Sequence, residues 1–263
     1  MIRRIVDGIL AQLPKRLLET IAEAECRISR AWVASAHRRL MHIQWALPPQ
    51  PEHFDHHIDL YYQFLSTRNP MWLERGAFGS LVLQGGQVLE LACGDGFNAR
   101  NFYSLLATKV VACDYDPNAI ATAKAKNHCE NVDFILADIR TTMPSGRFDN
   151  VVWDAAIEHF TPDEIRKILK DIKSRLSPTG ILNGYTIVEK ADGKQLDHHE
   201  YEFQDKQDLL GLLAAHFQHV TVFETIDPNR HNLYFWASDA DLPFRERWAK
   251  SVTERALHAP GIT

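Results

Sequence analysis

Cysteine is scarce in this sequence of 263 residues, and the few cysteines lie far apart. There are four of them, Cys26, Cys93, Cys113 and Cys129, and no two form a C-x-x-C pair. The chain therefore has neither the cysteine pattern of a structural zinc site nor that of a disulfide framework. This usage is typical of a reducing compartment, so we expect a cytoplasmic protein.

The sequence also lacks long apolar runs, internal repeats and low-complexity tracts. No run approaches the ~18 apolar residues that a membrane-spanning helix needs. Near the N-terminus, Arg3, Arg4 and Asp7 interrupt the apolar core that a signal peptide requires. We therefore expect neither a transmembrane segment nor a secretory leader.

Basic residues are too few and too localised for a nucleic-acid surface. The formal net charge is −5, but residues 1–47 carry eight Lys or Arg against four acids, a local balance of +4. Subtracting +4 from −5 leaves −9 for the remainder, and such a surface repels a phosphate backbone. We expect a small-molecule ligand and no nucleic-acid partner.

The N-terminal part of the chain has a helical pattern. Apolar residues recur at helical spacing across residues 2–13 and 14–45, which predicts two or three helices. The proline-rich stretch Leu47-Pro-Pro-Gln-Pro51 then marks a linker. Arginine-rich helix faces are typical of a solvated lid or dimerisation helix, and a membrane-surface helix is the alternative. We assign residues 1–79 to an N-terminal helical lobe, with a homodimer through these helices as one expectation.

A glycine loop after an apolar strand is the most informative stretch. Residues 88–92 have the length and composition of a buried parallel strand, and Gly94 and Gly96 permit a sharp turn close to a ligand. The range 98–106 predicts a helix whose N-terminus faces that ligand. The glycines alone also fit a dinucleotide-binding fingerprint, so a nicotinamide-dependent oxidoreductase is an alternative.

Acidic residues at the loop distinguish these two classes of ligand. Glu90, reinforced by Asp95, would repel a pyrophosphate but suits a ligand that carries an ammonium and a sulfonium. The stretch Glu90-x-x-Cys93-Gly94-x-Gly96 resembles motif I of the class I methyltransferases, which bind S-adenosylmethionine. Ala92 stands where that family often has its first glycine. The resemblance implies a cofactor-binding loop that contains Glu90, Ala92, Cys93, Gly94, Gly96 and Asn98.

The next two predicted strands also end in acids. Asp114 lies some two dozen positions after Glu90, where Rossmann-like folds place the carboxylate that binds the ribose hydroxyls. Tyr115, directly after it, is placed to lie on the adenine. At the end of the third strand, Asp138 and Ile139 match the family's adenine site, which implies that Asp138 accepts a hydrogen bond from the adenine amino group.

An aromatic segment precedes the glycine loop. In many small-molecule methyltransferases this place is taken by a cap over the methionine end of the cofactor. Tyr61, Tyr62 and Trp72 are candidates for its wall, and we assign Tyr61 to the cofactor. The alternative is that these aromatic side chains only pack a helix onto the sheet edge.

Candidate catalytic residues follow the fourth and fifth predicted strands. Glu158 and His159 come after the strand 148–154, whose Trp153 is a further candidate for cofactor contact. The carboxyl ends of parallel strands share one edge, so these residues and His199 should lie on the rim of the cofactor site. His159 is the candidate general base, with Glu158 and His199 beside it.

Metal binding is the alternative role for these residues. Some methyltransferases of this fold hold a divalent cation with a Glu-His pair after the fourth strand and a histidine after the fifth. Glu158 and His159, with His199 of the pair His198-His199, resemble that set. Ala155 stands where the pattern has another glutamate, so we favour metal-free catalysis and assign no metal ligand. Purely structural histidines are the third interpretation.

The order of strands and helices predicts the fold. Strands alternate with helices after the glycine loop, which indicates a parallel sheet with right-handed crossovers. The last two strands, 220–226 and 232–237, should form a hairpin. The class I methyltransferases have such a Rossmann-like α/β fold, a seven-stranded and mostly parallel sheet with an antiparallel C-terminal strand. We assign residues 80–240 to this domain and 241–263 to a tail.

The resemblance implies an enzyme that uses S-adenosylmethionine and releases S-adenosylhomocysteine. We predict transfer of the methyl group to a polar small-molecule acceptor. O-methylation of a sugar, glycolipid or hydroxylated metabolite is the first hypothesis, and N-methylation of a small amine is the second. A non-catalytic member of the fold that binds a partner through its N-terminal helices is a further alternative.

Overall fold

The computed structural model describes residues 14–46, 71–83, 85–190, 193, 198–227 and 230–243. These residues fall into two units. The first contains α2 (Lys15–Ala46), so the range 14–45 forms one continuous helix, whereas the range 2–13 lies outside the described residues. The second contains all elements from α4 (Met71–Ser80) onwards. None of the described helices is long and apolar enough to cross a membrane.

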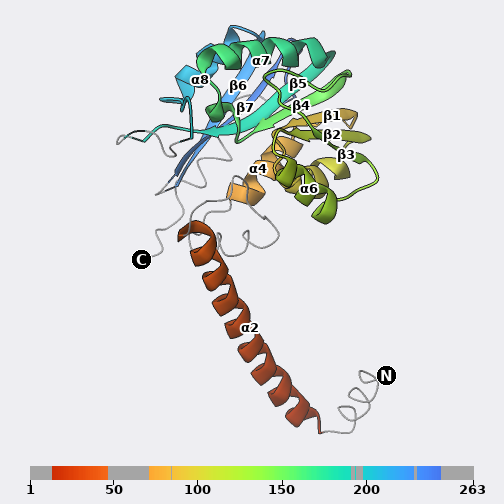
Figure 1. Ribbon diagram of the computed structural model, residues 1–263, viewed down its shortest axis with the longest axis vertical. Helices are drawn as coiled ribbons and strands as arrows, with labels where there is room; N and C mark the ends of the chain where they lie inside the picture. The colour runs from red at the N-terminus through yellow and green to blue at the C-terminus, as the bar shows by residue number, and fades with distance from the viewer. Residues whose placement is uncertain are drawn as a thin grey trace. The chain divides into compact units, whose positions relative to one another are not determined.

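The second unit is built on a seven-stranded sheet, shown in Figure 1. Its strand order is β3-β2-β1-β4-β5-β7-β6. Neighbouring strands from β3 to β5 are parallel, whereas β7 is antiparallel to both β5 and β6. The predicted fold is thereby confirmed. The strands are β1 (Gln87–Leu91), β2 (Lys109–Asp114), β3 (Val132–Leu136), β4 (Phe148–Asp154), β5 (Leu176–Ile187), β6 (His219–Asp227) and β7 (Arg230–Ser238).

Helices cover both faces of this sheet. The remaining helices are α5 (Phe97–Asn101), α6 (Pro117–Lys126), α7 (Pro162–Arg175) and α8 (Lys206–Ala214). Figure 1 shows α7 and α8 on one face and α4 and α6 on the other. Leu89 of β1 belongs to the buried cluster that contains Ile168 of α7, and Val88 to the cluster that contains Ile120 of α6. Successive side chains of β1 therefore point to opposite layers, as the pleat of a strand requires.

Two helices begin at caps that their own side chains form. The Asp116 carboxylate accepts a hydrogen bond from the Asn118 amide (2.8 Å), which caps α6. At α7, Thr161 and Glu164 form a capping box, in which the Glu164 carboxylate accepts from the Thr161 amide (2.9 Å). Both caps depend only on residues within one helical turn.

The helix predicted over residues 98–106 is wrong in length. α5 ends at Asn101, and Phe102 takes a non-helical conformation before the 3-10 turn η1 (Tyr103–Leu105). The break turns Tyr103 into the core, where a Cβ added to Gly79 of α4 would lie 2.9 Å from its hydroxyl. Packing against α4 thus overrides the local helical pattern.

β5 begins at Leu176 with an irregular pairing to β4. Phe148 pairs with Leu176 and Asn150 with Ile181, so β5 advances five residues while β4 advances two. The irregular part contains Gly180. A bulge therefore absorbs the extra residues of β5.

α4 is hydrogen-bonded to the sheet. Asn183 of β5 donates its side-chain amide to the Gly79 carbonyl (3.2 Å), and the Thr225 hydroxyl of β6 donates to the Glu74 carboxylate (2.8 Å). The sequence analysis grouped this helix with the N-terminal lobe, residues 1–79. Its side-chain contacts, however, join it to the sheet.

Deleting the residues before Pro48 should leave the sheet unit folded. Both buried clusters and α4 are made of residues after that point, so the truncation deletes none of their members. We expect one cooperative urea transition, with a free energy of unfolding within about 1 kcal/mol of that of the full chain. Loss of cooperativity in the truncated protein would show that the deleted residues belong to the same core.

Candidate cofactor and acceptor site

The candidate site lies at the carboxyl ends of the parallel strands. The strand order reverses between β1 and β4, because β2 and β3 extend from one side of this pair and β5 from the other. In open α/β sheets, ligands bind outside the carboxyl ends of the strands at such a reversal. The glycine loop follows β1, Asp114 ends β2, Asp138 follows β3, and Glu158 and His159 follow β4.

The glycine loop has the backbone conformation that the sequence predicts. Gly94 and Gly96 both have positive φ, 54° and 74°. A Cβ on Gly96 would lie 2.4 Å from the Phe134 ring, so neither the conformation nor the packing accepts a larger residue. The buried Asp95 carboxylate accepts from the Phe97 amide (3.1 Å) and closes the turn.

Two alanines near the strand reversal have left-handed backbone conformations. Ala92 follows β1 with φ 53°, and Ala155 follows β4 with φ 50°. They are the only non-glycine residues with positive φ in the described part of the chain. Such conformations cost of order 1 kcal/mol and concentrate at functional sites. Their position on the two strands that flank the reversal supports a ligand site between them.

Glu90 is a buried acid whose charge is stabilised only by the nearby Arg75 cation and opposed by neighbouring acids. It is 2% exposed, and its Oε2 atom has no hydrogen-bond partner among the described residues. Burial raises the pKa of Glu90 well above its usual range, and the nearby charges of Asp154 and Asp95 raise it further. A ligand cation would lower this pKa by stabilising the carboxylate.

Asp114 is held rigidly beside the glycine loop. Its Oδ2 accepts from the Gly94 amide and its Oδ1 from the Asp116 amide, both at 2.9 Å. These two amides fix the orientation of the carboxylate, and a carboxylate oxygen can accept more than one hydrogen bond. Tyr115, next in the chain, is 57% exposed.

Asp138 lies at the predicted place but is engaged by a neighbour. The Arg140 guanidinium donates to both of its carboxylate oxygens (2.9 and 2.8 Å), which lowers the pKa of Asp138. An adenine amino group would have to share these oxygens with Arg140. Ile139, which stands between Asp138 and Arg140 in the sequence, is buried at 5% exposure.

A buried ion pair links α4 to the site, and the sequence analysis missed it. Arg75 of α4 donates from Nε to Asp154 Oδ2 (2.8 Å) and pairs with the same atom through Nη2. The guanidinium lies 4.8 Å from the centre of the Tyr185 ring. Burial acts to lower the pKa of Arg75, but the Asp154 carboxylate outweighs it and raises the pKa.

Asn98, predicted to touch the cofactor, also reaches this pair. Its side-chain amide donates to Asp154 Oδ2 (3.2 Å), while its Oδ1 atom is buried without a hydrogen-bond partner among the described residues. Two acceptor atoms, Glu90 Oε2 and Asn98 Oδ1, are thus buried near Asp154 without donors. Cys93, in the same loop, is buried, and burial raises the pKa of its thiol.

Trp153 lies on the other side of the sheet from Glu90. In the register of β1 with β4, Glu90 is opposite Val152, and Leu91 is opposite Trp153. Trp153 is fully buried, and its ring centre lies 5.7 Å from that of Phe160. Its position in the core offers no support for the expected cofactor contact.

Glu158 anchors the segment that carries the later histidines. Its carboxylate accepts from the Thr186 hydroxyl of β5 (2.9 Å), and burial raises its pKa. Its main-chain carbonyl accepts from the amides of Glu200 (2.8 Å) and Tyr201 (3.1 Å). Glu158 therefore joins the turn η2 (Ile157–His159) to the segment after β5.

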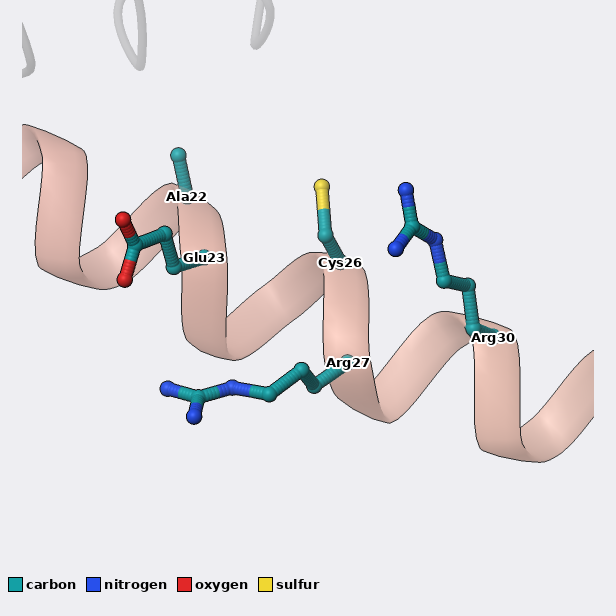
Figure 2. Close-up of a pocket in the computed structure, with 5 residues that line it drawn as sticks. All are labelled: Ala22, Glu23, Cys26, Arg27 and Arg30. Carbon is teal, nitrogen blue, oxygen red and sulfur yellow. The ribbon is translucent and has the colours of Figure 1, made fainter.

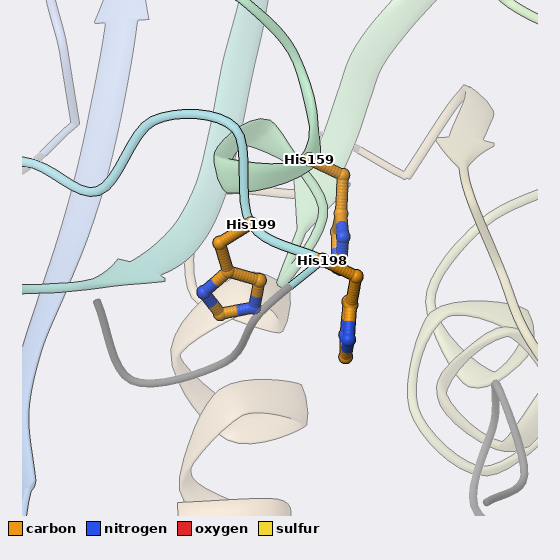
Figure 3. A group of neighbouring side chains, drawn as sticks. All are labelled: His159, His198 and His199. Carbon is orange, nitrogen blue, oxygen red and sulfur yellow. The ribbon is translucent and has the colours of Figure 1, made fainter.

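The predicted histidines come together on this rim. The His159 and His198 rings are parallel to within 4°, with centres 5.1 Å apart, and the His199 ring is nearly perpendicular to them (Figure 3). His199 is buried, and burial lowers its pKa, whereas His159 is partly and His198 largely exposed. Their rings form one cluster that reaches the surface.

Tyr61 and Tyr62 lie outside the described residues, and so does the side chain of Trp72. The other unit has a shallow hollow on the surface of α2 (Figure 2). All the side chains that line this hollow come from this one helix, so they do not enclose a ligand. Those side chains are Ala22, Glu23, Cys26, Arg27 and Arg30.

Comparison with protein families identifies residues 88–180 as a match to the family described as "Methyltransferase domain". Ribosomal protein L11 methyltransferase of Aliivibrio salmonicida is 31% identical over 111 residues, which are 42% of this chain and 35% of the relative. Malonyl-[acyl-carrier protein] O-methyltransferase of Bacillus anthracis is 26% identical over 97 residues, 36% of this chain and 35% of the relative. The chain thus spans about a third of each relative's length.

Solved structures show the same fold. A structure titled "DhpI-SAM-HEP complex" has a TM-score of 0.51 at 22% identity and covers 66% of this chain and 90% of that one. The N-methyltransferase NodS from Bradyrhizobium japonicum has a TM-score of 0.53 at 17% identity, covering 66% of this chain and 98% of that one. At these identities the likeness concerns the fold.

Proposed function

Because this chain belongs to the class I methyltransferases, which use S-adenosylmethionine, we propose that it transfers the cofactor's methyl group to a hydroxyl of a polar small molecule. The observation that carries this proposal is the pair of buried acceptor atoms, Glu90 Oε2 and Asn98 Oδ1. Buried acceptors without donors are costly. The ammonium of the cofactor is a cation that can donate to both of them.

Other residues would hold the rest of the cofactor. Asp114 is oriented to accept from the ribose hydroxyls, and the turn at Gly94 and Gly96 lets the backbone approach the ligand closely. Tyr115 follows β2 and has an exposed ring that can cover the adenine. Ile139 follows β3, the neighbouring strand, and its amide can donate to the adenine. The bound cofactor supplies a sulfonium methyl group that is already activated for displacement.

The protein must also remove the acceptor's proton. His159 follows β4 on the same rim as the cofactor residues and is partly exposed, so an acceptor hydroxyl can reach it. We therefore assign His159 as the general base. Glu158 and His199 act through position, since Glu158 fixes the segment after β5 and His199 borders the His159 ring.

Labelled cofactor tests this proposal directly. The protein would be incubated with S-adenosylmethionine that carries a labelled methyl, together with panels of sugars, hydroxylated metabolites and small amines. A labelled methyl ether supports the proposal. Label that appears only on amines would overturn the choice of a hydroxyl, and absence of S-adenosylhomocysteine binding would overturn the cofactor assignment itself.

Asp114→Ala should weaken S-adenosylhomocysteine binding. The change removes a carboxylate that is already oriented by two amides, and charge-assisted hydrogen bonds contribute about 1–3 kcal/mol, or roughly 5- to 150-fold in affinity. Calorimetry measures the loss, with NAD as a ligand that should not bind. Asp133→Ala removes an equal charge from an exposed pair with Lys109 and should bind normally. Unchanged affinity in Asp114→Ala would remove Asp114 from the site.

A further inference from the structure

We infer that His159, His198 and His199 form a binding site for a divalent transition-metal ion, with zinc as the probe. Figure 3 shows that the rings come from two segments, the turn after β4 and the chain after β5. One nitrogen of each ring lies within 4.8 Å of the others. In the described part of the chain, no other group of three His, Cys, Asp or Glu residues meets this condition.

An ion would require the three nitrogens to move closer and one ring to rotate, because the parallel His159 and His198 rings do not direct their in-plane lone pairs at one point. Zinc binds imidazole nitrogen at about 2.0–2.1 Å, so tetrahedral ligand atoms lie ~3.3 Å apart. The three nitrogens are at most 4.8 Å apart. His198 is exposed, so its side chain can turn towards the other two without disturbing the core.

His199 is already oriented as a metal ligand. Its Nδ1 is hydrogen-bonded to the Glu202 carboxylate, and both residues are 3% exposed. A carboxylate on one ring nitrogen selects the tautomer in which Nε2 is the nitrogen that can bind a metal. Histidines that bind metals usually have such a partner, which orients the ring and makes it more basic.

The chemistry of this set selects the class of metal. The three groups that come together here are all imidazoles, and the Glu158 carboxylate is hydrogen-bonded to the Thr186 hydroxyl. Imidazole suits zinc, copper and nickel, whereas calcium and magnesium prefer oxygen ligands. The two main-chain bonds to the Glu158 carbonyl fix the spacing between the segments.

This inference goes beyond the proposed function, and metal binding is measured without any methyl acceptor. One consequence does rest on that function. A bound ion would occupy the ring nitrogen of His159 that takes up the acceptor's proton, so equimolar zinc should lower methyl transfer and a chelator should restore it. Zinc would therefore act as an inhibitor of the enzyme.

The test uses the full chain without a histidine tag, freed of metal by a chelator and then dialysed. Zinc is titrated against a chromophoric indicator, and one ion per chain is expected to bind. His159→Ala and His199→Ala should abolish competition with the indicator. Glu202→Gln should weaken binding about 10- to 100-fold. His219→Ala, which removes an exposed histidine outside the cluster, should bind like the unmodified protein.

Several results would overturn the site. The first is the absence of stoichiometric zinc binding. The second is a zinc affinity of His159→Ala and His199→Ala equal to that of the unmodified protein. The third is magnesium binding as tight as that of zinc. Retained S-adenosylhomocysteine binding would show that a variant is folded. If His199→Ala does not fold because His199 is buried, His198→Ala replaces it in the test, since His198 is exposed. Zinc binding without methyl transfer would refute the proposed function alone. Methyl transfer without zinc binding would refute this site alone.

Discussion

Arg75→Met is expected to destabilise the sheet unit by about 3–5 kcal/mol, because it leaves the Asp154 carboxylate buried without its cation. Both side chains are less than 10% exposed, 9% and 6%. Glu90, whose carboxyl group lies close to Asp154, is an acid and cannot compensate. The methionine fills similar space, so most of the effect is electrostatic.

Urea unfolding of single and double variants would measure this effect. Adding Asp154→Asn to Arg75→Met should recover much of the stability, since asparagine removes the charge and still accepts from the Asn98 side chain. Arg166→Met is a matched control, because its pair with Asp163 is exposed and should contribute less than about 1 kcal/mol. A loss below about 1 kcal/mol in Arg75→Met would show that Asp154 does not depend on this partner.

The same ion pair explains how the cofactor loop is held in place. Arg75 comes from α4, Asp154 from β4 and Asn98 from α5, and their side chains meet at one carboxylate oxygen. Asn98 is therefore held in place by residues of two other elements. If Asn98 binds the cofactor as proposed, this order reduces the entropy lost on binding.

Local signals explain which parts of the fold could be predicted. The start of α7 depends on Thr161, Pro162 and Glu164, which lie within one helical turn. A capping box involves only these neighbouring residues, so it can be recognised without knowledge of distant contacts. Likewise, Asp114 ends an apolar strand, and its position in the sequence predicts its place at the strand end beside the glycine loop. Such elements can be recognised from a single sequence.

The contacts that were missed depend on distant pairing. Arg75 and Asp154 are 79 residues apart, and no periodic pattern connects them. Asp154 ends a buried strand, which indicates that its carboxylate needs a hydrogen-bond donor or a cation. The sequence does not indicate which residue supplies it. The face of Trp153 depends on the register of β4 with β1. Both strands are apolar almost throughout, so their sequences do not reveal that register.

His159→Ala should lower the rate of methyl transfer to a hydroxyl by about 10²- to 10⁴-fold, the usual contribution of a general base. S-adenosylhomocysteine affinity should not change, because backbone amides orient Asp114 and Asp95, and the substitution leaves these amides in place. The two measurements together separate loss of proton transfer from loss of the cofactor.

The assay would contain a chelator, so that any effect of a metal at the histidine cluster is excluded. His219→Ala, which removes a histidine from the start of β6, should keep full activity. Undiminished turnover in His159→Ala would reject His159 as the base. Such a result would favour an amine as the acceptor, since an unprotonated amine attacks the methyl group without a base. The variant therefore tests both the role of His159 and the class of the acceptor atom.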